Sequence, residues 1–343
     1  MNGVIDLHVD SIIIQRLFGY DITTRHRAGV AGQPLFWHAD IPRMFDAGYG
    51  GAFMGIHYYP WESERGWQEM RRQIGYLDEV AATDERVRRA RSVDDFEGAT
   101  REGKLALMPG VEGAHMLNGR IERVEELAEL GVGYLTLTHF SANAAATPSI
   151  GRGANEQERL TAFGRELIRQ LNLRGIAVDL AHVNTPGVLD ACRISDAPVL
   201  CTHTGVKGVY DNPRNITDAE IDAIADTGGV IGIILAPVFL GGSLRADTEL
   251  VLDHYEYVID RVGVEHVAIG SDYDGWIPTI PSDHRDCRGI QNVIDGLAAR
   301  GLDDEQLHQI VRGNVLRVMR QVEARATIPS GGQPTAVKQP VEG

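Results

Sequence analysis

Histidine and carboxylate side chains stand at or just beyond the ends of six short apolar runs in this sequence. These residues are His8 with Asp10, Glu112, His139, His182, His203 and Asp272. Imidazole and carboxylate ligands without a thiolate suit zinc and, less specifically, manganese or iron. The chemistry that the set favours is metal-assisted hydrolysis, in which a water between two cations loses a proton and becomes the nucleophile.

The spacing divides these side chains into two predicted ligand groups. His8 and Asp10 are two residues apart, so on a strand both would point to the same face and bind one ion. His182 and His203 follow consecutive apolar runs and would hold a second ion. Glu112 has two carboxylate oxygens and would bridge both ions. Asp272 would complete the site as a ligand and proton acceptor.

The remaining polar candidates carry weaker signals. His139 by itself fits a site role and a structural role equally well. Arg214 is by default a solvated loop arginine, but its place just beyond the sixth apolar run fits a substrate-binding role equally well. The other histidines are interpreted as hydrogen-bonded surface or core groups: His26, His38, His57, His115, His254, His266, His284 and His308.

Eight strand-like apolar runs, most of them separated by helical patterns, would position these side chains. Such alternation predicts βα units and a parallel sheet, and chemistry at the strand ends is typical of the (β/α)8 TIM barrel. We expect one barrel domain over residues 1–326 and a disordered tail over 327–343, with loop insertions at 19–40 and 273–289. The runs are 3–8, 51–58, 105–112, 134–139, 176–182, 198–203, 229–235 and 266–272.

Composition excludes several classes of function. The formal net charge of −15 argues against a nucleic-acid partner, because phosphate binding needs a basic surface. Three cysteines in 343 residues do not indicate a disulfide framework and fit a reducing compartment. No apolar run is long enough to span a membrane, and the first predicted ligands lie too close to Met1 for a cleaved leader. We therefore expect a cytoplasmic protein without a membrane partner.

Seven sequence segments resemble the membrane dipeptidase (renal dipeptidase-like) family, peptidase family M19 of the amidohydrolase superfamily. The resemblance extends from Val4 to about Val318. The segments are DLHVD at 6–10, GVEG at 110–113, YLTLTH at 134–139, VDLAH at 178–182, PRN at 213–215, IGSDYDG at 269–275 and GNVLR at 313–317. The resemblance implies a (β/α)8 barrel with a binuclear zinc site and metallopeptidase activity.

The resemblance also implies a role for each matching residue. By analogy His8, Asp10 and Asp272 serve one zinc, His182 and His203 serve the other, and Glu112 bridges them. His139 would contact the region of the scissile carbonyl, and Arg214 would bind the substrate carboxylate. The chain departs from the family pattern at residues 140–143 and in the loop that holds Trp276 and residues 283–286, which bears on the substrate.

The function expected from residues and resemblance together is that of a cytoplasmic dipeptidase with two Zn²⁺ per chain. Hydroxide held between the metals would attack the peptide carbonyl, and Asp272 would carry the proton to the leaving amine. The family accepts a D-residue on the carboxyl side, so we expect the same here. Hydrolysis of an N-acyl amino acid or another small amide or lactone is the alternative, and a non-catalytic metal-binding protein is a weaker one. The oligomeric state stays open between monomer and homodimer.

Overall fold

Nine strands form a single parallel sheet in the described part of this chain. The computed structural model describes residues 3–27, 36–59, 61–277 and 279–328. The strands are β1 (Val4–Val9), β2 (Tyr49–Ile56), β3 (Val87–Arg89), β4 (Leu105–Val111), β5 (Tyr134–Thr136), β6 (Ala177–Asp179), β7 (Leu200–Thr204), β8 (Val230–Ile233) and β9 (Val267–Ile269).

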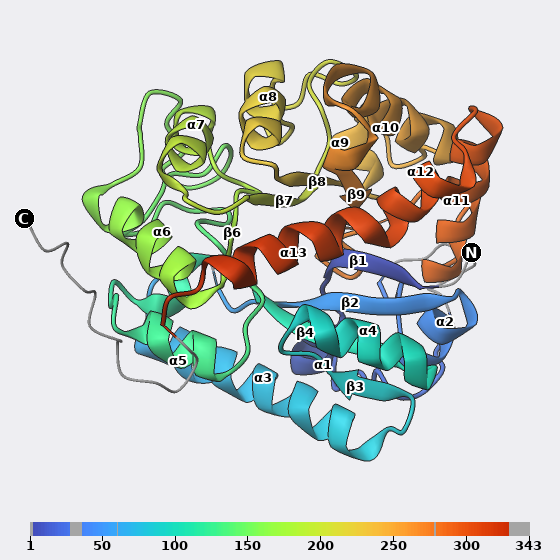
Figure 1. Cartoon of the computed structure of the whole chain (residues 1–343), viewed down its shortest axis with the longest axis horizontal. Helices are drawn as coiled ribbons and strands as arrows, with labels where there is room; N and C mark the ends of the chain where they lie inside the picture. The colour runs from blue at the N-terminus through green and yellow to red at the C-terminus, as the bar shows by residue number, and fades with distance from the viewer. Residues whose placement is uncertain (1–2, 28–35, 60, 278, 329–343) are drawn as a thin grey trace, which may run out of the picture.

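Eight of these strands close into a barrel. The hydrogen-bonded order is β2-β1-β9-β8-β7-β6-β5-β4-β3, and a further parallel pairing of β2 with β4 joins the two sides into a ring. Helices surround the ring, as Figure 1 shows. The predicted (β/α)8 TIM barrel is therefore confirmed, and each of the eight predicted strand-like runs overlaps a barrel strand.

The structure differs from the expectation at strand ends and in one additional strand. β3 pairs only with the first three residues of β4 and lies outside the ring. It was not predicted, because Val87–Arg89 contains a single apolar residue and two arginines. Strands β5, β6 and β9 stop three residues before His139, His182 and Asp272, so these side chains lie on loops beyond the sheet.

Thirteen α-helices occur among the described residues. Thr217 and Glu220 form a capping box at the start of α8, and Asp303 and Gln306 form another at the start of α12. A π-helical segment, Gln309–Gly313, then joins α12 to α13. The helices are α1 (Ser11–Phe18), α2 (Ile41–Asp46), α3 (Glu64–Thr83), α4 (Val93–Glu102), α5 (Arg123–Glu129), α6 (Ala162–Arg174), α7 (Thr185–Ile194), α8 (Asp218–Asp226), α9 (Pro237–Gly241), α10 (Thr248–Val262), α11 (Ile290–Ala299), α12 (Asp304–His308) and α13 (Asn314–Arg325).

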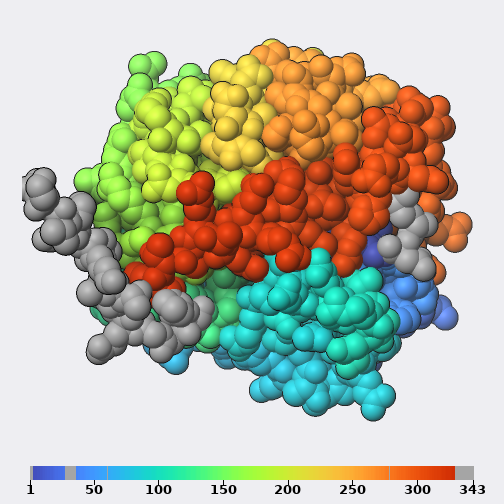
Figure 2. Space-filling view, in the orientation of Figure 1, coloured from blue at the N-terminus to red at the C-terminus, as the bar shows by residue number. Residues whose placement is uncertain are grey.

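Helix α13 closes the N-terminal end of the barrel. Its residues Val315, Val318 and Met319 belong to one buried cluster with Ile5 and Leu7 of β1. Figure 2 shows the C-terminal part of the chain as a continuous red band between the cyan and the green-to-yellow parts of the molecule. A larger apolar cluster packs the strands against the surrounding helices. The C-terminal strand ends, by contrast, hold the polar side chains.

Three predicted segments fall partly on residues without a description. Residues 28–35 of the insertion at 19–40, residue 278 of the insertion at 273–289 and residues 329–343 of the predicted tail lie outside the described ranges. The prediction of a disordered tail therefore stays a prediction. In the described part of the chain, no helix combines the length and the apolar character that a membrane span requires.

Candidate binuclear metal centre and active site

All eight candidate residues lie at or just beyond the C-terminal ends of barrel strands. Glu112 directly follows β4, and His203 is part of β7. His139, His182 and Asp272 follow β5, β6 and β9, respectively. Because the strands are parallel and neighbouring, these loops meet at one end of the barrel, where TIM-barrel enzymes carry their chemistry.

The first ligand pair is not arranged as the sequence spacing predicted. β1 ends at Val9, and Asp10 has a non-extended backbone with φ −97° and ψ 16°. The pairing of β1 with β2 also shifts register between Asp6 and Val9, and the Asp10 N–H donates to the carbonyl of Tyr273 at 2.7 Å. The prediction that both ligands lie on the strand is therefore wrong for Asp10. The two side chains still converge, with 3.1 Å between His8 Nε2 and Asp10 Oδ1.

Glu112 occupies the centre of the cluster. Its Oε1 lies 3.0 Å from His182 Nε2, 3.4 Å from His203 Nε2 and 3.7 Å from His8 Nε2. Its Oε2 lies 3.5 Å from His139 Nε2. One carboxylate thus reaches imidazoles that come from four different strands or their loops, which is the placement that a bridging ligand needs.

Three sets of potential metal-ligand atoms overlap in this cluster, each with all atoms within 4.8 Å of one another. Two sets share Glu112, one with His8 and Asp10 and the other with His182 and His203. The third joins His8, His203 and Asp272. The first two match the predicted pair of ion sites. Asp272 lies beside both of them, with its Oδ1 3.8 Å from His8 Nε2, and its assignment to one ion stays a prediction.

The electrostatics of the first pair favour a cation. Burial by itself lowers the pKa of His8, but the carboxylates of Asp10 and Glu112 outweigh burial and raise that pKa to about 10. Positive charge is therefore strongly favoured at His8 Nε2, and a divalent ion would supply it as well as a proton does. His8 Nε2 and Asp10 Oδ1 are buried 3.1 Å apart, and neither has a well-aligned hydrogen bond within the described residues, so the pair fits a metal.

The second pair is neutral and ready to act as ligands. Burial lowers the pKa of His182 and His203 well below the ordinary histidine value, and the charge of Arg214 adds to this effect. The Thr202 hydroxyl donates to Asp179 at 3.0 Å and lies 2.9 Å from His203 Nδ1. Because that hydroxyl has a single proton, it accepts from His203 Nδ1–H, which leaves a lone pair on Nε2 facing Glu112.

Ionisation of the buried Glu112 carboxylate costs free energy when no positive charge lies beside it. Burial and repulsion from Asp10 raise the pKa of Glu112 well above the ordinary value. Bound cations would reverse this cost, because they stabilise the ionised carboxylate. The donor set of imidazoles and carboxylates therefore fits a pair of divalent cations, held by His8, Asp10, Glu112, His182 and His203 with Asp272 beside them.

Backbone strain and close packing occur at the same residues. His182 has φ 68° and Asp272 has φ 60°, in the left-handed region that side chains other than glycine rarely adopt. Such conformations cost on the order of 1–3 kcal/mol each and are typical of functional sites. A Cβ at Gly55 would lie 1.6 Å from Asp10 Oδ1, and one at Gly275 would lie 1.9 Å from Asp272 Oδ1. The chain therefore needs glycine at both positions to leave room for the carboxylates.

A small cavity adjoins the cluster. It has a volume of about 90 Å³. Arg214 lines it with its side chain buried, and Arg214 Nη2 donates to the carbonyl of His203 at 2.9 Å. The interpretation of Arg214 as a solvated loop residue is therefore excluded. The cavity is lined by Asp10, Glu112, His139, Phe140, His182, Arg214, Val238, Phe239, Asp272, Gly275, Trp276 and Ile277.

Two residues near the site were assigned no function from the sequence. His57 is buried, and its ring lies edge to face against the ring of His139, with 4.6 Å between centroids. Tyr134 places its hydroxyl 2.6 Å from His8 Nδ1 and so orients a predicted ligand. His57 directly follows β2, and this strand-end position could have indicated it. Strand-end position could not have indicated Tyr134, because this residue begins its strand and would be interpreted as a core residue.

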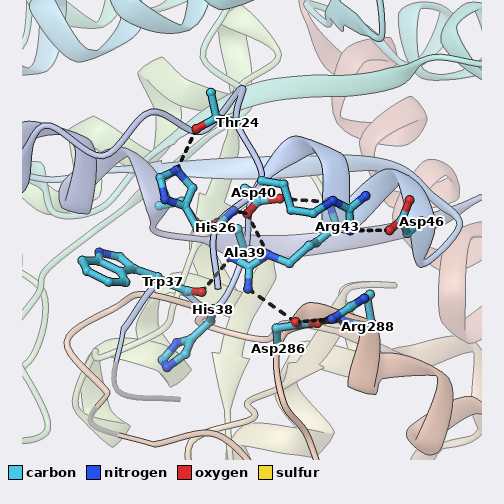
Figure 3. A network of polar contacts seen from close by, with 12 residues as sticks. Thr24, His26, Trp37, His38, Ala39, Asp40, Arg43, Asp46, Asp286 and Arg288 are labelled. Atoms are coloured by element: carbon cyan, nitrogen blue, oxygen red, sulfur yellow. Dashed lines mark hydrogen bonds and ion pairs between the residues drawn. The ribbon is translucent and has the colours of Figure 1, made fainter. Parts of the chain in front are cut away.

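The two loop insertions are held together beside the site. In Figure 3, Arg43 donates to the carbonyl of Trp37 at 2.7 Å, forms a 2.7 Å ion pair with Asp40 and lies 3.5 Å from Asp286. The second link is Asp274, which accepts the N–H of His38 at 2.7 Å. Asp286 thus contacts α2 and Asp274 contacts the segment before it, which fixes the loop that carries Asp272.

Comparisons with known proteins agree with this geometry. The sequence profile of the membrane dipeptidase family, peptidase family M19, matches residues 2–329. Dipeptidase tcpJ of Claviceps purpurea is 30% identical over 87% of this chain and 72% of its own length. Dipeptidase 3 of Mus musculus is 33% identical over 72% of this chain, which spans about half of the mouse protein.

Solved structures show the same likeness. A Rhodobacter sphaeroides metallopeptidase, solved with a phosphinate mimic of the dipeptide L-Ala-D-Ala, superposes with a TM-score of 0.84 at 25% identity. That match covers 94% of this chain and 99% of the other. A family M19 metallopeptidase named dipeptidase AC gives the same TM-score and identity over 94% and 98% of the two chains. The chain therefore belongs to the membrane dipeptidase family, peptidase family M19, a family of metallo-dipeptidases.

Proposed function

We propose that this chain is a dipeptidase that uses two Zn²⁺ per chain. The observation that carries the proposal is the placement of Glu112, whose carboxylate lies within 3.0–3.7 Å of Nε2 atoms of His8, His182 and His203. Arg214 lines the same cavity and supplies a cation for a free carboxylate. Metal ligands and a carboxylate-binding group in one small cavity match the needs of dipeptide hydrolysis.

The side chains divide the reaction between them. Bound cations would supply Lewis-acid activation of the attacking water and of the peptide carbonyl. Burial lowers the pKa of His139, so its imidazole is neutral and donates its one N–H toward the carbonyl oxygen as negative charge develops there. Asp272 accepts the proton of the attacking water and delivers it to the leaving amine. Arg214 binds the substrate carboxylate, and this contact excludes longer peptides.

We also propose that the carboxyl-side residue can have the D configuration. Support comes from the Rhodobacter sphaeroides relative, whose structure was solved with a mimic of L-Ala-D-Ala. Arg214 holds the carboxylate by charge and hydrogen bonds, and these contacts do not by themselves distinguish the two configurations of the adjacent carbon.

Substrate profiling tests the proposed function. Zinc-loaded protein should hydrolyse L,L- or L,D-dipeptides, lose the activity in a chelator and regain it when zinc is restored. The N-acyl amino acid alternative predicts faster turnover of N-acyl substrates than of free dipeptides. Metal-dependent binding without turnover of any substrate would contradict both and favour the non-catalytic alternative.

We propose a cytoplasmic location as well. Cys192, Cys201 and Cys287 are free thiols, and the last two are buried, which fits a reducing compartment. Cell fractionation should recover the native protein with cytosolic markers. Recovery from a secreted or membrane fraction would contradict this location.

A further inference from the structure

The cavity beside the metal ligands has a polar and an apolar wall. The polar wall carries Arg214, His139 and four of the predicted ligands, namely Asp10, Glu112, His182 and Asp272. The apolar wall is made by Phe140, Val238, Phe239, Trp276 and Ile277. Among the described residues, no charged side chain lines this second wall. A substrate that contacts both walls must therefore present a polar and an apolar part.

The order of strands around the barrel orients the substrate across these walls. Arg214 follows β7, Phe239 lies in α9 after β8, and Trp276 follows β9, so the three come from neighbouring loops. The guanidinium carbon of Arg214 lies 6.0 Å from the centroid of the Phe239 ring. Phe140 follows β5, and its ring lies edge to face against the His182 ring with 4.8 Å between centroids. A carboxylate bound by Arg214 would therefore lie next to the residues of the loops that follow β8 and β9.

Trp276 forms the outer edge of this wall. Its side chain lines the cavity but is half exposed, and its backbone lies in the left-handed region with φ 60°. The ring contacts Phe36 of the other insertion edge to face, with 6.1 Å between centroids. Two residues before it, buried Asp274 anchors the loop to the His38 backbone. The indole is therefore held in place from two directions.

The cavity is small for a dipeptide. Its volume of about 90 Å³ lies well below the roughly 300–1,000 Å³ of typical small-molecule pockets. Most of a bound dipeptide must then lie along the polar wall, and little volume is left beside Trp276 and Phe239. A charged side chain at this position would lose hydration, and Arg214, the cation beside Phe239, would already bind the terminal carboxylate, so burial of that charge is costly.

On the basis of the proposed dipeptidase function, we infer that Val238, Phe239, Trp276 and Ile277 form the pocket for the side chain of the carboxyl-side residue. Trp276 limits the size of that side chain. The preferred substrates are accordingly dipeptides that end in a small apolar residue such as alanine. Bulky and acidic residues at this position are disfavoured.

The kcat/KM values of a dipeptide series test this inference. The zinc-loaded protein is assayed with an alanyl residue followed by alanine, leucine, phenylalanine or glutamate, in whichever stereochemical series it cleaves. We expect alanine to be preferred over phenylalanine by on the order of tenfold or more, the scale at which an apolar pocket discriminates by size. Trp276→Ala should reduce that preference by about tenfold, chiefly through faster cleavage of the phenylalanine substrate.

Two further variants make the result specific to the pocket. Trp276→Gly removes the indole and suits the positive φ, so it tests the same claim without backbone strain. Phe45→Ala removes another exposed aromatic ring, from α2, which leads into the opposite end of the barrel. The alanine preference of Phe45→Ala should equal that of the unaltered protein.

A binding measurement separates this inference from the proposed function. Calorimetry with phosphinate dipeptide mimics that carry alanine-like or phenylalanine-like carboxyl-side residues needs no turnover. The small mimic should bind more tightly than the bulky one, and this difference in affinity should be smaller in both Trp276 variants. That result would support the pocket even if no dipeptide were cleaved. The inference would be overturned if small and bulky residues gave equal kcat/KM values and equal affinities, in the unaltered protein and in both variants. The dipeptidase proposal would then stay intact.

Discussion

The two ends of the barrel are buried to the same degree but contain opposite kinds of side chain. At the N-terminal end, Val315 and Val318 of α13 share one apolar cluster with Ile5 and Leu7, and each of the four residues is 0% exposed. At the C-terminal end, Glu112 is equally shielded, at 2% exposed, yet carries a carboxylate. Apolar burial stabilises the first end directly. Burial of carboxylates at the second end lowers the free energy of unfolding until cations bind, and the apolar packing of the first end offsets this loss.

Tyr134 marks the boundary between the two ends. Its ring belongs to the same apolar cluster as Val318, whereas its hydroxyl contacts His8. Burial raises the pKa of the Tyr134 hydroxyl well above its ordinary value, so the group stays protonated. The comparison predicts that changes at the polar end alter activity with little loss of stability, and that changes at the apolar end do the reverse.

The largest effect on activity is expected for Asp272→Asn. The amide keeps the shape of the side chain but cannot accept a proton, so kcat should fall on the order of 10²-fold or more. Steady-state rates and metal content are measured together, because Asp272 also lies beside the ligands. The exposed Asp295→Asn should behave like the unaltered protein. Two bound metals with near-normal kcat in Asp272→Asn would assign the proton transfer to another group, such as Glu112.

Tyr134→Phe tests the boundary residue. The change removes the hydroxyl 2.6 Å from His8 Nδ1 but keeps the ring in the apolar cluster. Partners that orient a ligand contribute roughly 10- to 100-fold to metal affinity, so zinc binding should weaken by that amount while the melting temperature of the metal-free protein changes little. Competition with a chelator measures the affinity. Unchanged zinc affinity would show that His8 does not depend on this contact.

Arg214→Ala separates binding from chemistry. The substrate carboxylate has the same charge in the ground and transition states, so the loss should raise KM about 10- to 100-fold and change kcat little. Dipeptides with a free carboxylate should be penalised more than their amides. Arg214→Lys, which keeps the charge, should recover part of the loss. An equal penalty for acids and amides would remove Arg214 from the carboxylate site.

Val318→Ala should affect activity least. It deletes two methyl-group carbons from a fully buried position on α13, which should lower the free energy of unfolding by about 2 kcal/mol. Denaturant titration measures this change, while kcat and metal content should stay as they were. A fall in kcat at full metal occupancy would mean that the two ends of the barrel are coupled.

The sequence allowed the barrel and its ligands to be predicted because both depend on local patterns. Eight apolar runs predicted eight strands, and the ends of those runs identified Glu112, His182 and His203. Features that depend on how strands pair in three dimensions could not be predicted from these local patterns. Strand β1 shifts register against β2 and ends at Val9, before Asp10, and β3 is defined by its pairing with β4 alone.

Other features of the site depend on contacts between distant segments. His57 reads as an ordinary histidine until its ring is seen against His139. Burial of Arg214 depends on the loops after β7 and β8. The small cavity likewise depends on Trp276 and Phe239, which follow different strands and both line it. Sequence alone could point to Trp276 as a departure from the family pattern, but not to its place at the edge of the cavity.

The central claim is that two divalent metals share Glu112, and elemental analysis of purified, zinc-loaded protein tests it most directly. We expect about two metals per chain, because two sets of ligand atoms meet at this carboxylate. Glu112→Ala should lose metal from both positions, whereas His203→Ala should mainly empty one. A Glu112→Ala protein that keeps two metals and full activity would contradict the binuclear account.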